Sequence, residues 1–184
     1  MRITGLLLWC LLAVSGAVGS NEAFDRLEFY KYLHTHPELS FQEEQTAKLL
    51  AKTWRDAGFE VTEGIGGYGV VGLLRNGDGP TLMLRMDTDG LPVEEQTGLP
   101  YASRARAVEQ NGQEVSVMHA CGHDVHMTVG TETALNLIQR RDEWQGILMI
   151  IAQPAEERGA GARAMLNDGL FERFARPDFT LSMP

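Results

Sequence analysis

The sequence predicts an α/β domain in which a mainly parallel sheet is flanked by helices. Residues 81–86 and 146–152 are almost uninterrupted apolar runs, as expected for strands that are covered on both faces. Before and between these runs lie segments whose apolar residues recur at helical spacing. Strands that alternate with helices in this way are typical of a domain built on a mainly parallel sheet.

The helices and strands of the first half are indicated by spacing and by breaks. Residues 23–55 are expected to form two helices, because apolar residues recur at helical spacing on both sides of a break at His36 and Pro37. Two strands are expected next, over residues 59–61 and 68–74, since both are bounded by glycine-rich turns.

The second half continues the alternation. A helix is expected from about residue 124 to residue 140, before the buried strand at 146–152. Residues 160–168 are predicted to be helical again, with Gly169 as the stop. A last strand is expected over residues 178–183.

Composition limits the class of protein. The 184 residues are 43% hydrophobic and 22% charged, which suits one folded domain with a core and excludes a disordered chain. The formal net charge is −9. A negative chain repels phosphate backbones, so no nucleic acid is expected as a partner.

The first twenty residues are expected to be a signal peptide. Arg2 precedes an apolar run at residues 6–14, and small residues follow at 15–20. The apolar run is far shorter than the roughly 20 residues that cross a bilayer. We therefore expect export to the periplasm or the medium, cleavage near Ser20, and no membrane partner afterwards.

Cysteine usage excludes a disulfide framework. Cys10 lies within the expected signal peptide, so the mature chain keeps a single thiol, Cys121. A lone thiol in an oxidising compartment needs a reason, and metal ligation is one.

Polar clusters lie where the predicted strands end. Asp87 and Asp89 follow the first buried run, and residues 153–157 follow the second. Residues 119–126 come directly before a predicted helix. Because parallel sheets collect their functional groups at the carboxyl ends of strands, these three clusters predict one site.

Residues 119–126 have the composition of a metal site. Three histidines, one cysteine and one aspartate occur within eight residues, and these donors suit transition metals. The alternative is a polar loop that caps a helix, with Asp124 as the cap. Composition alone does not identify which residues bind.

The acidic pairs each allow two interpretations. Of Glu156 and Glu157, one could bind a metal while the other accepts a proton from water, or both could be solvated at a helix start. Asp87 and Asp89 would point the same way in an extended segment, which suits one ligand and one supporting residue, or they could form a turn.

A second histidine pair precedes these clusters. His34 and His36 could share a metal, but the adjacent Pro37 and the loop position favour a structural or substrate-side role.

Four segments together resemble the M20 metallopeptidase family, in particular its amidohydrolase branch of hippurate hydrolases, N-acyl-L-amino-acid amidohydrolases and plant auxin-conjugate hydrolases. They occur in the family's order between residues 24 and 183. The segments are LHTHPELSFQEE at 33–44, LRMDTDGLPVEE at 84–95, MHACGHDVH at 118–126 and QPAEE at 153–157.

The resemblance implies a role for each site residue. It implies that Cys121, His123 and Glu157 are metal ligands and that Glu156 is the general base. The residues to which it gives supporting roles are Asp87, Asp89, Asp124 and His126.

The resemblance also implies the reaction. It implies a divalent metal, two ions per complete site, with zinc or manganese favoured and cobalt or nickel as alternatives. The implied substrate is an N-acyl amino acid or a short peptide, from which an amino acid and a carboxylic acid are released.

Family members are longer than this chain. We therefore expect residues 21–184 to be the amino-terminal part of the catalytic domain, without the lid and dimerisation domain, and to have little or no activity alone. A homodimer is expected only in a full-length form. The alternative is a non-catalytic, exported metal-binding relative.

Overall fold

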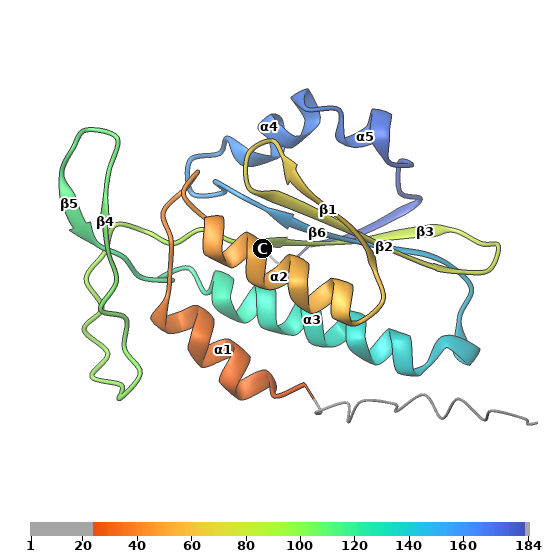
Figure 1. Cartoon of the computed structure of the whole chain (residues 1–184), viewed down its shortest axis with the longest axis horizontal. Coiled ribbons are helices and arrows are strands. Elements are labelled where there is room, and N and C mark those ends of the chain that lie inside the picture. Colours follow the sequence, from red (N-terminus) through yellow and green to blue (C-terminus); the bar gives the residue numbers. More distant parts are fainter. Residues whose placement is uncertain (1–23, 183–184) are drawn as a thin grey trace, which may run out of the picture.

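The computed structural model describes residues 24–182 (Figure 1). The predicted signal peptide lies outside the described residues. No helix within residues 24–182 is long and apolar enough to span a membrane.

A five-stranded sheet forms the centre of the domain, with the strand order β1-β2-β6-β3-β7. Strand β2 is antiparallel to β1 and β6, whereas β3 is parallel to β6 and β7. Four strands therefore run in one direction, which confirms the prediction of a mainly parallel sheet. The strands are β1 (Glu60–Ile65), β2 (Gly69–Asn76), β3 (Thr81–Asp87), β6 (Gly146–Gln153) and β7 (Phe179–Ser182).

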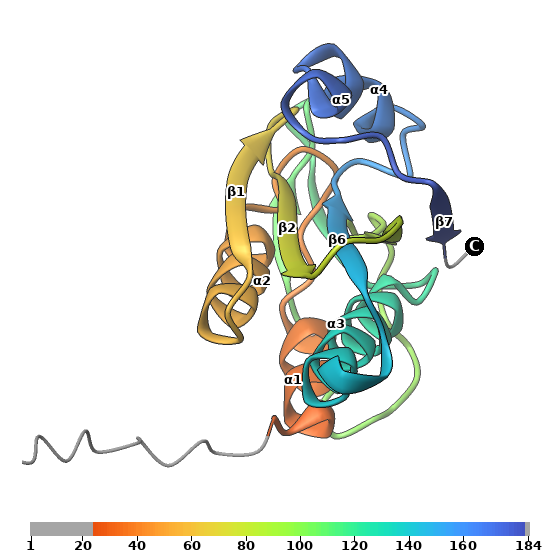
Figure 2. The same ribbon diagram turned by 90° about the vertical axis from the view of Figure 1, so that its right-hand side faces the viewer.

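Helices cover both faces of this sheet (Figures 1 and 2). On one face lie α1 (Arg26–Thr35), α2 (Glu44–Asp56) and α3 (His123–Gln139). On the other face lie the shorter helices α4 (Gly161–Asn167) and α5 (Leu170–Arg173). The two helices predicted around Pro37 and the later helices at 124–140 and 160–168 are thus confirmed within a few residues.

Alternation along β6 divides the core into two layers. Leu148 and Ile150 belong to the apolar cluster under α1, α2 and α3, whereas Met149 and Ile151 belong to the cluster under α4 and α5. Successive side chains of a strand point to opposite faces, so a strand with both faces covered is apolar throughout. This explains why residues 146–152 form an unbroken apolar run.

Four short elements were not predicted from the sequence, and one of them is the four-residue helix α5, which follows the predicted stop at Gly169. Strands β4 (Arg106–Val108) and β5 (Glu114–Ser116) form a hairpin that projects beside the domain (Figure 1), and a 3₁₀ turn spans Arg141–Glu143. These elements have only three or four residues each, which is too short to display a hydrophobic period.

The sheet register brings two of the polar clusters together. Asp87 at the end of β3 is paired with Gln153 at the end of parallel β6. The carboxyl ends of both strands therefore lie at the same edge, as the sequence predicted.

Replacement of Trp54 tests the packing of the core layer under α1, α2 and α3. It is fully buried between α2 and the sheet, and its Nε1 donates to Thr131 Oγ1 of α3 at 3.2 Å. We expect Trp54→Ala to lower the free energy of unfolding by about 3–5 kcal/mol, because it leaves a cavity and an unpaired hydroxyl. Urea denaturation followed by circular dichroism measures this.

The matched control is Leu27→Ala, since that side chain is 55% exposed. Its change should stay within about 0.5 kcal/mol. A similar small change for Trp54→Ala would contradict the packing described here.

Candidate metal centre

His123 is the central residue of the site. It is the first residue of α3, its ring is buried, and its Nδ1 donates to the backbone carbonyl of Asp89 at 2.7 Å. Because a carbonyl can only accept, this contact fixes the proton on Nδ1. Nε2 is left with a lone pair for a ligand.

Three carboxylates converge on Nε2 of His123. The distances from Nε2 are 3.6 Å to Asp87 Oδ2, 3.7 Å to Glu156 Oε2 and 3.8 Å to Glu157 Oε1. Donors that each lie about 2.1 Å from one tetrahedral ion are about 3.4 Å apart. The spacing is therefore close to that of ligands around a shared cation.

The hydrogen bonding of Glu157 also fits a cation. Its Oε1 is buried and has no hydrogen-bond partner among residues 24–182. A buried anionic oxygen without a partner is costly, and a metal ion is a group that satisfies it.

A second group of possible ligands shares Asp87 and His123. His126 Nδ1 donates to Asp87 Oδ1 at 2.6 Å, and Arg85 Nη1 donates to Asp87 Oδ2 at 3.0 Å. One donor atom each from Asp87, His123 and His126 lies within 4.8 Å of the others. The structure thus brings His126 into ligand range, whereas the resemblance implied only a supporting role.

Cys121 is a member of neither of these two groups, although its thiol lies near Glu157. Its side chain is exposed, and the pKa of its thiol is raised to about 11, chiefly because the adjacent carboxylate of Glu157 favours the protonated thiol. It is therefore protonated at neutral pH in the absence of a cation, and a nearby divalent ion reverses this preference. Its ligand role stays a prediction.

Asp89 lies behind the two glutamates. Its carboxylate accepts from the backbone N–H groups of Glu156 at 3.0 Å and Glu157 at 3.1 Å, and from Ser40 Oγ at 2.6 Å. Burial opposes its charge, but these donors and His123 outweigh that effect and lower its pKa. Asp89 therefore fixes the turn that carries Glu156 and Glu157.

Glu43 holds the same turn from the other side. Ala155 has the left-handed φ of 48°, and its N–H donates to Glu43 Oε1 at 2.8 Å. A non-glycine residue in this region is strained and needs such support. The sequence interpretation included Glu43 only as part of a motif, because a glutamate next to a helix start gives no sign of burial.

Asp124 points away from the carboxylates around His123. Its Oδ2 lies 2.6 Å from Nδ1 of His34, which comes from α1.

His119 is also buried, and neither of its ring nitrogens has a hydrogen-bond partner within residues 24–182. Burial lowers its pKa to about 4, so the ring is neutral.

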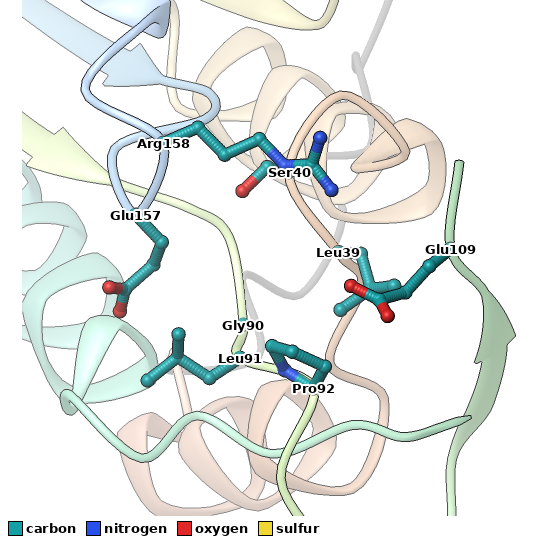
Figure 3. A pocket seen from close by; sticks show the side chains of 8 residues that line it. All are labelled: Leu39, Ser40, Gly90, Leu91, Pro92, Glu109, Glu157 and Arg158. Atoms are coloured by element: carbon teal, nitrogen blue, oxygen red, sulfur yellow. The ribbon is translucent and has the colours of Figure 1, made fainter. Parts of the chain in front are cut away.

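A pocket of about 240 Å³ opens beside Glu157 (Figure 3). Glu157 forms one wall, and Glu109, from the segment between β4 and β5, forms the opposite wall. Its lining residues are Leu39, Ser40, Gly90, Leu91, Pro92, Glu109, Glu157 and Arg158. A group bound in this pocket is therefore adjacent to the candidate metal centre.

Comparisons with known proteins find similar sequences over most of the chain. The model of peptidase family M20/M25/M40 matches residues 83–183. The hippurate hydrolase of Campylobacter jejuni is 45% identical over 143 residues, which are 77% of this chain and 34% of that protein. An N-acetylcysteine deacetylase of Bacillus subtilis is 41% identical over 147 residues, which are 75% of this chain and 34% of that protein.

A solved structure has the same fold. It is a Bacillus subtilis protein described as a dinuclear metal-binding peptidase of the M20 family, with a TM-score of 0.70 and 39% identity. The match covers 80% of this chain and 39% of that structure. The chain spans about a third of the length of the curated relatives it matches.

Glu43 gives the site a pH-dependent stability. Burial raises the pKa of this carboxyl from 4.5 to about 7. Between these values the unfolded chain loses the proton and the folded chain keeps it, so stability falls as the pH rises. Relative to Glu43→Gln, the free energy of unfolding of the wild type should fall by about 3 kcal/mol across this window.

Urea unfolding of the wild type and Glu43→Gln in EDTA from pH 4 to pH 8 measures this. Glu44→Gln is the control, since its side chain is exposed and paired with Lys48. Parallel stability curves for the wild type and Glu43→Gln would contradict the assignment.

Proposed function

The chain belongs to peptidase family M20/M25/M40, and we propose from this that it carries the amide-hydrolysing centre of a metal-dependent amidohydrolase. The observation that carries the proposal is the convergence of three carboxylates on Nε2 of His123. The names of two relatives denote removal of an acyl group from the nitrogen of an amino acid. The proposed substrates are therefore N-acyl amino acids.

The donors of this chain suit a divalent cation. His123 and Glu157 are the proposed ligands together with Cys121, and Asp87 and His126 add donors for a second ion. Imidazole, thiolate and carboxylate together favour zinc or manganese, with cobalt and nickel as alternatives. Such a cation supplies Lewis-acid polarisation of the amide carbonyl and lowers the pKa of water.

Glu156 is the proposed general base. Its side chain is 41% exposed, compared with 15% for Glu157 and 3% for Asp87, so it is the carboxylate that water and substrate reach most easily. It accepts a proton from the attacking water while the water oxygen bonds to the carbonyl carbon. It then delivers that proton to the amine nitrogen as the carbon–nitrogen bond breaks.

The pocket beside Glu157 is the proposed site of the acyl group. Leu39, Leu91 and Pro92 supply apolar contact. Glu109 and Glu157 face the pocket with Arg158 as the one cationic lining residue, so a neutral acyl group is favoured over a carboxylate. The carboxylate of the amino acid then lies outside this pocket.

Replacement of Glu156 tests the proposal in the complete protein that contains this sequence. Glu156→Gln should bind as much zinc as the wild type, measured by elemental analysis. Its turnover of N-benzoylglycine and N-acetylcysteine should fall at least about 100-fold, because the proton acceptor is lost.

Glu114→Gln is the control, because Glu114 lies on β5 and pairs with Arg106 at the surface. Unchanged turnover in Glu156→Gln would remove the base assignment. Zinc binding by a wild type that hydrolyses neither substrate would instead support a non-catalytic metal-binding relative.

We further propose that residues 1–20 direct export and are then removed. The support is the apolar run at 6–14, which follows Arg2 and precedes small residues. A reporter fused to residues 1–23 should be exported with Asn21 as its new amino terminus, as read by terminal sequencing. The same fusion carrying Leu7→Arg and Leu11→Arg should stay inside the cell, and export of that variant would refute the proposal.

A further inference from the structure

His34 is a buried histidine between two carboxylates. It lies near the end of α1, and its side chain is 7% exposed. Nδ1 lies 2.6 Å from Asp124 Oδ2, and Nε2 lies 3.1 Å from Glu95 Oε1. Both partners are nearly fully buried.

Glu95 is itself firmly held. Its carboxylate accepts from the backbone N–H of Ser103 and from the hydroxyl of Thr97. The ring of Tyr101 packs edge-on against His34, with ring centroids 5.5 Å apart. The cluster therefore joins α1, the segment 95–103 and the start of α3.

A buried ionic cluster is poor evidence for a purely stabilising role. Removing charges from water costs free energy that their attraction does not reliably return, and apolar residues often stabilise such a place as well. Here burial opposes a charge on His34, whereas Asp124 and Glu95 outweigh that effect and raise its pKa. What the contacts do show is that the cluster connects three segments that are far apart in the sequence.

The position of Asp124 shows which part of the fold the cluster contacts, namely the first turn of α3. Asp124 stands between His123 and His126 in the first turn of α3. The residue before this turn, Gly122, provides no side-chain cap. Helix positions 123 and 126 share a face, whereas position 124 is turned away from it and faces α1.

Each polar side chain of this turn therefore has its own partner. His123 bonds to the carbonyl of Asp89, His126 bonds to Asp87, and Asp124 bonds to His34. The first two contacts set the rotation of the rings. The third anchors the helix turn from which both rings project.

We propose that His34 is a positioning residue for the metal centre. Through Asp124 it holds the first turn of α3, so that His123 and His126 keep their orientation toward the carboxylates at the strand ends. His34 itself contacts neither the ion nor the substrate. This inference rests on the proposed function, since it assumes that these histidines bind a cation.

The test compares His34→Gln with His36→Gln in the complete protein. His36 is exposed and bonds to the backbone of Tyr32, so it is the matched control. In folded His34→Gln, zinc affinity measured against a chromophoric chelator should fall about 10–100-fold, as for other residues that orient metal ligands. His36→Gln should bind zinc as the wild type does.

Two further readouts separate positioning from mere stability. The visible spectrum of the cobalt form should change in His34→Gln, and kcat should fall while KM for N-benzoylglycine stays nearly constant, because the pocket is untouched. Wild-type zinc affinity in a folded His34→Gln would overturn the inference, even if its urea midpoint were lower.

Glu95→Gln keeps the test decisive if His34→Gln does not fold. Glu95 contacts Nε2 of His34, whereas Asp124 contacts Nδ1, so Glu95→Gln disturbs Asp124 only indirectly. The zinc affinity of the Glu95→Gln protein should therefore fall by a smaller factor, about 3–10-fold. Unchanged affinity would overturn the inference. If the wild type binds zinc without turnover, the proposed function fails while the zinc measurement still decides the role of His34.

Discussion

The parallel pairing of β3 with β6 is the constraint on which the site depends. It aligns Asp87 with Gln153, so both strands deliver their following residues to one edge of the sheet. Helix α3 begins at that edge, and His123 is its first residue. Donors that are far apart in the sequence therefore meet because two strands run the same way and end at the same level.

Buried polar residues then convert this proximity into fixed geometry. Asp89 and Glu43 hold the turn of Glu156 and Glu157 through its backbone N–H groups, and the carbonyl of Asp89 also sets the ring of His123. Loops at the ends of strands are otherwise the most mobile parts of a domain. Here the loop that bears the proposed base is supported by two carboxylates from different segments.

Sequence reasoning found the groups that project into the site and named Asp89 and Asp124 as supports, but it did not find the support from Glu43 or the partners of His34. Asp87, His123, Glu156 and Glu157 stand at strand ends or helix starts, where local patterns mark them. Glu43 is 112 residues from the amide it binds, and His34 is 61 and 90 residues from its two partners. No periodicity reports such contacts, because a buried glutamate or histidine has the same local pattern as a solvated one.

The crowding of three carboxylates around one imidazole nitrogen has a consequence for the stability of the folded chain. A cation that binds there recognises only the folded form, since folding alone assembles the donors. By mass action, each tenfold rise in free ion above its dissociation constant adds about 1.4 kcal/mol of stability. If the proposed cation binds, free divalent ions in the surroundings therefore raise the free energy of unfolding and lower the population of unfolded chain that proteases can cut.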